Sequence, residues 1–265
     1  MTPEITDRLE LAIRIAQGAG QIVEDLRKQF QVEKKADSTP VTDADKAAEV
    51  YLRAEIEAQF SSDAVIGEEF GQSAGTSGFT WVVDPIDGTK SFIAGVPLYG
   101  TLVGVLYEGK PVIGVIELPA LDCRVFAASG SGAFQQNGQS ERIPARVSNA
   151  KSLSEGVYVT SEVKTFQARN ALDVHLQLEE KAWYGRTWGD CYGYYLVATG
   201  RALAMVDPVM SIWDAAAILP VMEEAGGAFV DWNGNPTVHS GEGIGATKEV
   251  LDEVLAVTRP FATKK

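Results

Sequence analysis

The segment WVVDPIDGTKSF, which begins at Trp81, constrains the fold of this chain more than any other. Three apolar residues, typical of the end of a buried strand, are followed at once by Asp84, a proline and Asp87. A buried carboxylate is costly unless a cation or hydrogen-bond donors pair with it. The fold must therefore bring a partner for two acids to the end of a core strand.

The composition of the 265 residues limits what that partner can be. With 45% hydrophobic and 22% charged residues, the chain can bury a full core. The net charge of −13 argues against nucleic acid or a membrane as partner, since both bind basic surfaces. No apolar run approaches the roughly 18 residues that span a bilayer, and we expect no signal peptide. Cys123 and Cys191 lack metal-type spacing, which favours a reducing, cytoplasmic location.

Hydrophobic periodicity predicts two helices at the start of the chain. One covers residues 5–30, and Thr42 is placed to cap the other, which extends to Phe60. The polar, proline-bearing segment 34–45 is predicted as a loop up to that cap. Alternating strands follow, including a hairpin over 99–118, so the half 1–148 is predicted to be largely antiparallel sheet.

The second half, 149–265, changes to alternating strands and helices, with helices near 165–180 and 249–257. No repeat or long linker separates the halves, so we expect 1–265 to form a single compact unit of α/β class. The glycine-rich GEGIG at 241–245 follows no clear strand and is assigned to a turn.

Several catalytic chemistries are disfavoured by the residues present. His175 and His239 are the only histidines, neither neighbours a nucleophile, and both are predicted to lie at the surface. Neither cysteine is followed six positions later by arginine, as a cysteine phosphatase requires. The pair Asp43 and Asp45 resembles the nucleophile pair of haloacid-dehalogenase-type phosphatases, but it follows a polar loop instead of an apolar strand.

Acidic residues remain, and they close three apolar segments. Glu68 and Glu69 follow AVIG, Asp84 and Asp87 follow WVV, and Asp214 lies where a helix begins. Each has a simpler alternative when taken alone: a surface pair, a turn, or an acid favoured by a helix dipole. Their common position at the ends of apolar elements favours one shared site.

The stretch DPIDGT is the strongest signal among them. Proline turns the chain sharply, so that Asp84, Asp87 and the Ile86 carbonyl can face one point. An all-oxygen cluster suits Mg²⁺, then Mn²⁺ or Ca²⁺, and excludes a cysteine or histidine zinc site. Gly88 lets backbone approach a ligand, and a helix opening at Thr89 would offer free N–H groups to phosphate. The combination predicts metal-assisted phosphoryl transfer to water.

Four motifs, in this order, resemble those of the inositol monophosphatase family: GEE at 67–69, DPIDGT at 84–89, WDAAA at 213–217 and EAGG at 224–227. The similarity extends over nearly the whole chain. It implies a layered αβαβα sandwich, commonly a homodimer, that hydrolyses phosphate monoesters with two or three Mg²⁺ ions and is often lithium-sensitive. Mn²⁺ is a possible substitute.

The resemblance also implies a role for each matched residue. The metal ligands would be Glu68, Asp84 and the Ile86 carbonyl for the first ion, Asp84, Asp87 and Asp214 for the second, and Asp45 for a weaker third. Glu68 and Thr89 would orient and help deprotonate the attacking water, with Asp84 bridging the two ions. Lys34 or Lys35 would add positive charge near the phosphate, and the sequence leaves that choice open.

The substrate is predicted from smaller differences. DPIDGTKSF is closer to the histidinol-phosphatase branch than to inositol-type members, although nucleotide-type members also carry lysine at the place of Lys90. Asp190, in GDCYGYY, could pair with the ammonium group of histidinol phosphate, with Asp207 assisting, or it could simply cap a helix. The residues predicted to bind substrate are Asp87, Gly88, Thr89, Asp190, Asp207 and Arg186.

The function predicted is therefore a Mg²⁺-dependent phosphomonoesterase of histidine biosynthesis that acts on histidinol phosphate. An alternative in the same class is an inositol-1-phosphate phosphatase or a phosphatase of broad specificity for sugars or nucleotides. A different class, a catalytically idle metal-binding regulator, is disfavoured because every matched acid is present.

Overall fold

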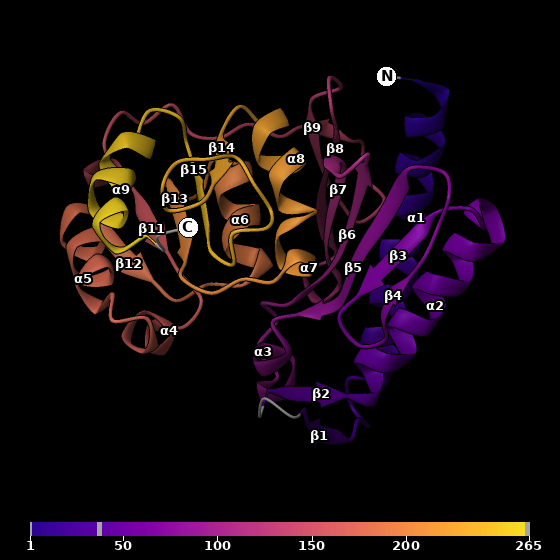
Figure 1. Cartoon of the computed structure of the whole chain (residues 1–265). Coiled ribbons are helices and arrows are strands. Elements are labelled where there is room, and N and C mark those ends of the chain that lie inside the picture. The colour runs from indigo at the N-terminus through magenta and orange to yellow at the C-terminus, as the bar shows by residue number, and fades with distance from the viewer. Residues whose placement is uncertain (1, 36–38, 263–265) are drawn as a thin grey trace.

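The computed structural model describes residues 2–35 and 39–262 as five stacked layers of helices and sheets. The layers follow one another across the molecule, from α5 and α9 on one side to α1 and α2 on the other (Figure 1). This is the layered αβαβα arrangement that the sequence resemblance predicts. Among the described residues, no helix is both long enough and apolar enough to cross a membrane.

The first outer layer consists of the helices α1 (Pro3–Leu26) and α2 (Asp43–Phe60). Thr42 caps α2 as predicted, and its side chain and that of Asp45 bond to each other's backbone N–H groups. A short hairpin pairs β1 (Val32–Lys34) with β2 (Pro40–Thr42). The predicted loop 34–45 was therefore wrong at Lys34 and over β2, because strands of three residues are too short to show apolar alternation.

Within residues 2–35 and 39–262, the first sheet has eight strands in the order β10-β9-β8-β7-β6-β5-β3-β4. Their bounds are β3 (Ala64–Gly67), β4 (Gly71–Ser73), β5 (Phe79–Asp87), β6 (Gly100–Tyr107), β7 (Lys110–Leu118), β8 (Cys123–Ala128), β9 (Ala133–Asn137) and β10 (Ile143–Pro144). All of these pairings are antiparallel except that of β3 with β5, so the predicted character of this half is confirmed. The short helix α3 (Thr89–Ala94) follows β5.

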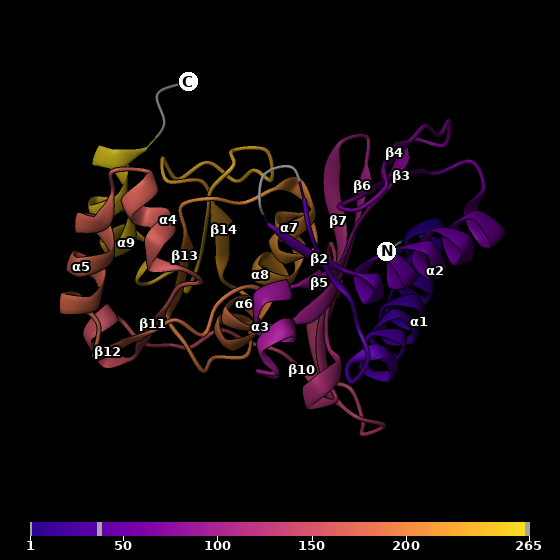
Figure 2. The ribbon, with the colours of Figure 1, turned by 90° about the horizontal axis from the view of Figure 1, so that it is seen from below.

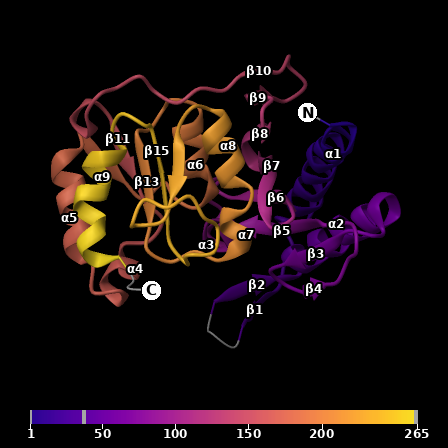
Figure 3. The same cartoon turned by 45° about the horizontal axis from the view of Figure 1, so that its top comes forward.

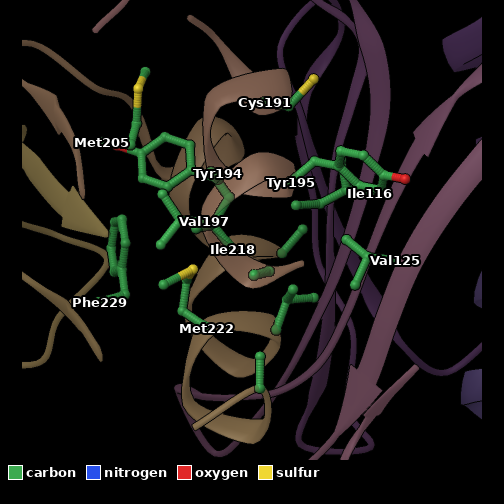
Figure 4. Close-up of a cluster of buried hydrophobic side chains, with 14 of the residues drawn as sticks. Ile116, Val125, Cys191, Tyr194, Tyr195, Val197, Met205, Ile218, Met222 and Phe229 are labelled. Carbon is green, nitrogen blue, oxygen red and sulfur yellow. The ribbon is translucent and has the colours of Figure 1, made fainter. Parts of the chain in front are cut away.

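The middle layer contains α6 (Cys191–Ala198), α7 (Ile212–Ala215) and α8 (Ile218–Glu224) between the two sheets. Their apolar side chains form one buried cluster with residues of both sheets. Figure 4 shows Ile218 and Met222 of α8 between Phe229 of the second sheet and Val125 of the first. The middle helices therefore pack against both sheets and bury one face of each.

The second sheet, as far as the structure describes the chain, has five strands in the order β12-β11-β13-β15-β14. Their bounds are β11 (Val157–Val159), β12 (Tyr184–Arg186), β13 (Ala204–Asp207), β14 (Ala228–Val230) and β15 (Gly243–Ala246). β11 pairs in parallel with both β12 and β13, whereas β15 is antiparallel to its neighbours. The helices α5 (Leu172–Lys181) and α9 (Leu251–Thr258) cover its outer side, with α4 (Val163–Ala168) beside them (Figure 3). In the described part of the chain, single-turn 3₁₀ helices lie at Pro119–Leu121, Leu153–Glu155 and Arg259–Phe261.

Three predictions for this half were wrong. The helix expected near 165–180 is broken into α4 and α5, because Asn170 adopts a left-handed φ of 59°. His175 is buried beside the rings of Tyr158 and Phe166 instead of lying at the surface. The GEGIG segment enters strand β15, where a Cβ on Gly245 would lie 2.6 Å from the Tyr194 ring, so glycine serves close packing there.

Candidate active site

The parallel pairing of β3 with β5 brings Glu68 next to Asp84. Gly67 lies opposite Val83 in this pair, so the residues that follow them, Glu68 and Asp84, lie at the same end of the two strands. Asp84 is only 2% exposed, whereas Glu68 is half-buried. The sequence placed both acids at strand ends, and the register explains why they meet.

Strand β5 does not end at Val83, as the sequence suggested, but continues to Asp87 through an irregular stretch. Asp84 lies opposite Leu102 and Asp87 opposite Gly100, so the pairing shifts between the two acids. Within that stretch the Ile86 N–H donates to Asp84 Oδ1 at 3.0 Å. Proline donates no ladder hydrogen bond, which suits the irregular position between the carboxylates.

Asp214 approaches the same point from the first turn of α7. It is fixed there because the Ser211 N–H donates to its Oδ2 at 2.6 Å. Asp84, Asp87 and Asp214 each offer a carboxylate oxygen, and these oxygens lie within 4.8 Å of one another. Two acids from β5 and one from α7 thus converge, although Asp214 lies more than a hundred positions after the other two in sequence.

Burial makes this cluster hard to ionise. It raises the pKa of Asp84 well above the usual range, and the charge of Glu68 adds to the effect. Burial and the charge of Asp190 do the same for Asp87. Burial is also the main cause that raises the pKa of Asp214 to about 7. A hydrogen bond from the Ser211 backbone lowers this pKa, and the charges of Glu68 and Asp207 raise it. A divalent cation would remove this penalty, and the all-oxygen donor set fits a hard ion.

Asp45 supplies a further test of that fit. Its side chain is fully buried, and its Oδ2 accepts hydrogen bonds from the Thr42 N–H at 2.7 Å and from the Thr42 hydroxyl at 2.5 Å. Its other oxygen, Oδ1, has no hydrogen-bond partner in the part of the chain that the structure describes. A buried carboxylate oxygen without a donor is suited to a metal ion.

Lys35 is the lysine that the fold brings to the acids. Its Nζ lies 2.7 Å from a carboxylate oxygen of Glu68 and 2.7 Å from one of Glu69. Burial disfavours the charged lysine, but the two acids outweigh it and raise the Lys35 pKa. Lys34 lies in the exposed strand β1. The sequence left open whether Lys34 or Lys35 lies near the acids. In the structure, Lys35 contacts Glu68, whereas Lys34 faces solvent.

Of these residues, Lys35, Glu68 and Asp214 line a cavity of about 780 Å³. Its walls come from the β1–β2 hairpin, from the start of α3 and from the segments before α4, α6 and α7. Figure 2 shows α3, α7 and β2 together between the two halves of the chain. Another cavity, of about 640 Å³, lies between α1 and Arg142 and contains none of the candidate ligands.

The predicted phosphate-binding segment, Gly88 and Thr89, lines the cavity of about 780 Å³. Gly88 adopts a φ of 90°, and a Cβ there would lie 3.0 Å from Asp190 Oδ2. The Thr89 hydroxyl donates to the Ile86 carbonyl at 3.1 Å, and α3 begins at Thr89. The positive φ and the nearby Asp190 carboxylate together explain why glycine occupies this position.

Asp190 stands at the N-terminus of α6, but its side chain makes no capping hydrogen bond. It has an unusual backbone for a residue other than glycine, with φ at 50°. Its N–H donates to Ser161 Oγ at 3.0 Å, while its carboxylate lines the cavity. Side-chain capping, the simpler alternative from the sequence, therefore does not describe this residue.

Asp207 and Arg186 do not line the main cavity among the described residues. Asp207 is buried and accepts hydrogen bonds from the Ser161 hydroxyl at 2.8 Å and the Tyr194 hydroxyl at 2.9 Å. It borders an adjoining cavity of about 150 Å³, and burial raises its pKa to about 7. Arg186 is exposed on edge strand β12, where its guanidinium lies over the rings of Tyr184 and Trp188.

The sequence analysis missed Ser161 and Glu162, which line both cavities. They follow β11, which lies in the parallel part of the second sheet. The rule that singled out Glu68, a polar residue after an apolar strand, applies equally to VYVTSE. These residues could have been found, and were overlooked because they carry no family motif.

Comparison with known proteins adds independent evidence. A model of the inositol monophosphatase family matches residues 4–264. A histidinol-phosphatase of Chlorobaculum parvum is 43% identical over 96% of each chain, and one of Mycobacterium tuberculosis is 36% identical over 94% of this chain and 96% of its own. The solved IMPase structure of Thermotoga maritima, 29% identical, covers 96% of this chain and 98% of its own with a TM-score of 0.85. The chain belongs to the inositol monophosphatase family.

Proposed function

We propose that this protein hydrolyses L-histidinol phosphate to L-histidinol and phosphate, a step of histidine biosynthesis that we assign to the cytoplasm. The convergence of Asp84 and Asp87 with Asp214, which lines the cavity of about 780 Å³, carries the reaction class. The substrate assignment is supported by histidinol-phosphatases of three bacteria, 36% to 43% identical to this chain over nearly its whole length. Together they favour a phosphomonoesterase with a substrate that carries positive charge.

The donor set fits Mg²⁺, with Mn²⁺ as a possible substitute. The proposed ligands are Glu68, Asp84 and the Ile86 carbonyl for one ion, Asp84, Asp87 and Asp214 for another, and Asp45 for a weaker third. When bound, the metal would lower the pKa of the attacking water and neutralise charge on the phosphate oxygens. A bound cation would also favour the ionised forms of Asp84 and Asp87, whose pKa values burial raises.

The chain's own residues position the reactants. The Thr89 hydroxyl gives its hydrogen to the Ile86 carbonyl, so its oxygen can accept one from the attacking water. Glu68 would receive the water's proton. Gly88 admits the phosphate close to the backbone, and Asp190, beside it, would pair with the substrate's ammonium group.

The test is phosphate release from L-histidinol phosphate and from inositol 1-phosphate by one enzyme preparation, with Mg²⁺ and after treatment with EDTA. We expect a larger kcat/KM for histidinol phosphate, and activity that disappears with EDTA and returns with Mg²⁺. A larger kcat/KM for the inositol ester would overturn the substrate assignment while leaving the reaction class intact.

A second substrate class is favoured by one specific relative. A protein of Arabidopsis thaliana named bifunctional phosphatase IMPL2 is 35% identical over 83% of this chain and 63% of its own length. A phosphatase of broad specificity, active on inositol or sugar phosphates, is therefore the alternative. Comparable kcat/KM values for the two esters in the same assay would support it.

A further inference from the structure

Glu162 occupies a distinctive place in the candidate active site. It precedes α4, and its side chain makes no capping hydrogen bond to that helix. It lines both the cavity of about 780 Å³ and the adjoining one of about 150 Å³, so it lies where the two meet. The side chain is 41% exposed and therefore accessible to a ligand that enters from solvent.

Glu162 forms an ion pair with Lys90 across the cavity mouth. Lys90 belongs to α3 of the first half, whereas Glu162 belongs to the second, so the pair links two segments 72 positions apart. The Lys90 side chain is 67% exposed. Because solvent screens an exposed pair, Lys90 holds Glu162 only weakly and a second cation can replace it.

Asp190 and Glu162 lie at different depths, since Asp190 is half-buried whereas the Glu162 side chain is 41% exposed. The carboxylate of Asp190 approaches Gly88, which lies next to the proposed phosphate position, whereas Glu162 is paired at the mouth. Histidinol phosphate has a matching order of groups: the ammonium is attached one carbon from the phosphate-bearing carbon, and the imidazole ring lies farther along the chain. An acid near the phosphate suits the ammonium, and a more distant acid suits the ring.

We propose that Glu162 is a specificity-determining residue that binds the imidazole N–H of the substrate in place of Lys90. The inference rests on the proposed function and deepens it. A carboxylate hydrogen bond to a ring that carries positive charge part of the time is stronger than one to a neutral hydroxyl. An ester without such a ring gains nothing from Glu162.

The test compares Glu162→Gln with the wild-type enzyme on two esters. L-histidinol phosphate carries ammonium and ring, and O-phosphoethanolamine carries the ammonium at the same spacing without a ring. We expect kcat/KM for histidinol phosphate to fall about tenfold, mainly through KM, and kcat/KM for phosphoethanolamine to stay within about twofold. Glu180→Gln is the matched control, because Glu180 is an exposed acid of the same half outside both cavities.

A binding measurement separates recognition from turnover. Histidinol lacks the phosphate, so its inhibition constant reports on the ammonium and ring sites alone. We expect this constant to rise about as much as KM in Glu162→Gln and to stay unchanged in Glu180→Gln.

The outcomes distinguish this inference from the function it rests on. If the wild type prefers histidinol phosphate and Glu162→Gln keeps that preference, the role of Glu162 is overturned and the proposed function stands. Equal losses on both esters would also overturn it, since they would mean that Glu162 does not read the ring. If the wild type shows no preference for histidinol phosphate, the proposed function itself fails and the inference with it.

Discussion

Single carboxylates show the chemistry of this chain most clearly. Asp84 is almost completely buried, and Glu68, Asp87 and Asp214 all raise its pKa through their charges in addition to burial. Such a placement costs folding free energy in the absence of a cation. The burial of these acids is therefore explained by a role as metal ligands, and not by a contribution to the stability of the fold.

A pH-dependent stability follows from these acids. Asp214 has a folded pKa of about 7, above the value of about 4 expected in the unfolded chain. Between these values the folded state binds more protons, so the free energy of unfolding contributed by Asp214 falls as pH rises through that window. In EDTA, we expect the wild-type Tm to decrease between pH 5 and pH 8 more than that of Asp214→Asn.

Added Mg²⁺ provides the control for that measurement. It should raise the wild-type Tm most at pH 8, where the acids are ionised, and less in Asp214→Asn. Parallel Tm profiles of the two proteins across this pH range would contradict the assignment of the shift to Asp214.

The same residues show what sequence can reveal about a site. Asp84, Asp87 and Asp214 were identified from motifs and chemistry, because acids after apolar segments leave a mark in the sequence. The choice of Lys35 over Lys34 depends on where the β1–β2 hairpin carries each side chain, and no local pattern encodes that.

At the scale of elements, an interaction between α1 and the first sheet supports the strands that carry the site. Arg8 of α1 donates two hydrogen bonds of 2.8 Å to Asp63, which precedes β3. Asp63 also accepts from the Ser77 hydroxyl at 2.6 Å and from the Trp81 indole at 2.9 Å. A single buried carboxylate thus joins α1 to the starts of β3 and β5.

Asp63→Asn should therefore destabilise the protein strongly. The change leaves the buried Arg8 guanidinium without its counter-charge, which costs on the order of 3–5 kcal/mol of unfolding free energy. Urea unfolding measures the loss. Glu55→Gln is the control, because its ion pair with Arg14 is exposed and should cost less than about 1 kcal/mol. Equal losses in the two variants would refute this account of Asp63.

Elements with clear alternation were the most predictable. The hairpin over 99–118 appears as β6 and β7, because both strands place apolar residues in the core. The burial of His175 was not predictable from the sequence, since the aromatic rings beside it belong to Tyr158 of β11 and Phe166 of α4. Only the folded chain brings these elements next to the histidine. Tertiary contacts decide such positions, and periodicity does not report them.

For the whole molecule, we propose that the chain folds as one unit. The face of the first sheet that carries Ile116 and Val125 is covered by helices of the second half. A fragment of residues 1–148 would expose this apolar face to water. We expect the fragment to be poorly folded or aggregated, as measured by binding of a hydrophobic dye and by circular dichroism. A monomeric fragment with cooperative unfolding would contradict the prediction.

The homodimer implied by the family resemblance also belongs to this scale and remains a prediction. Light scattering after size exclusion should give twice the 28.5 kDa mass of one chain. A mass equal to that of one chain at micromolar concentration would overturn it.

The account as a whole depends on Asp84 as a ligand of catalytic metal ions. The most direct measurement is Mg²⁺-dependent phosphate release from histidinol phosphate by Asp84→Asn, with the Tm in EDTA measured on the same sample. We predict a loss of activity of at least about a hundredfold, together with an unchanged or higher Tm because a buried charge has been removed. Activity close to that of the wild type in the folded variant would contradict the metal-dependent mechanism.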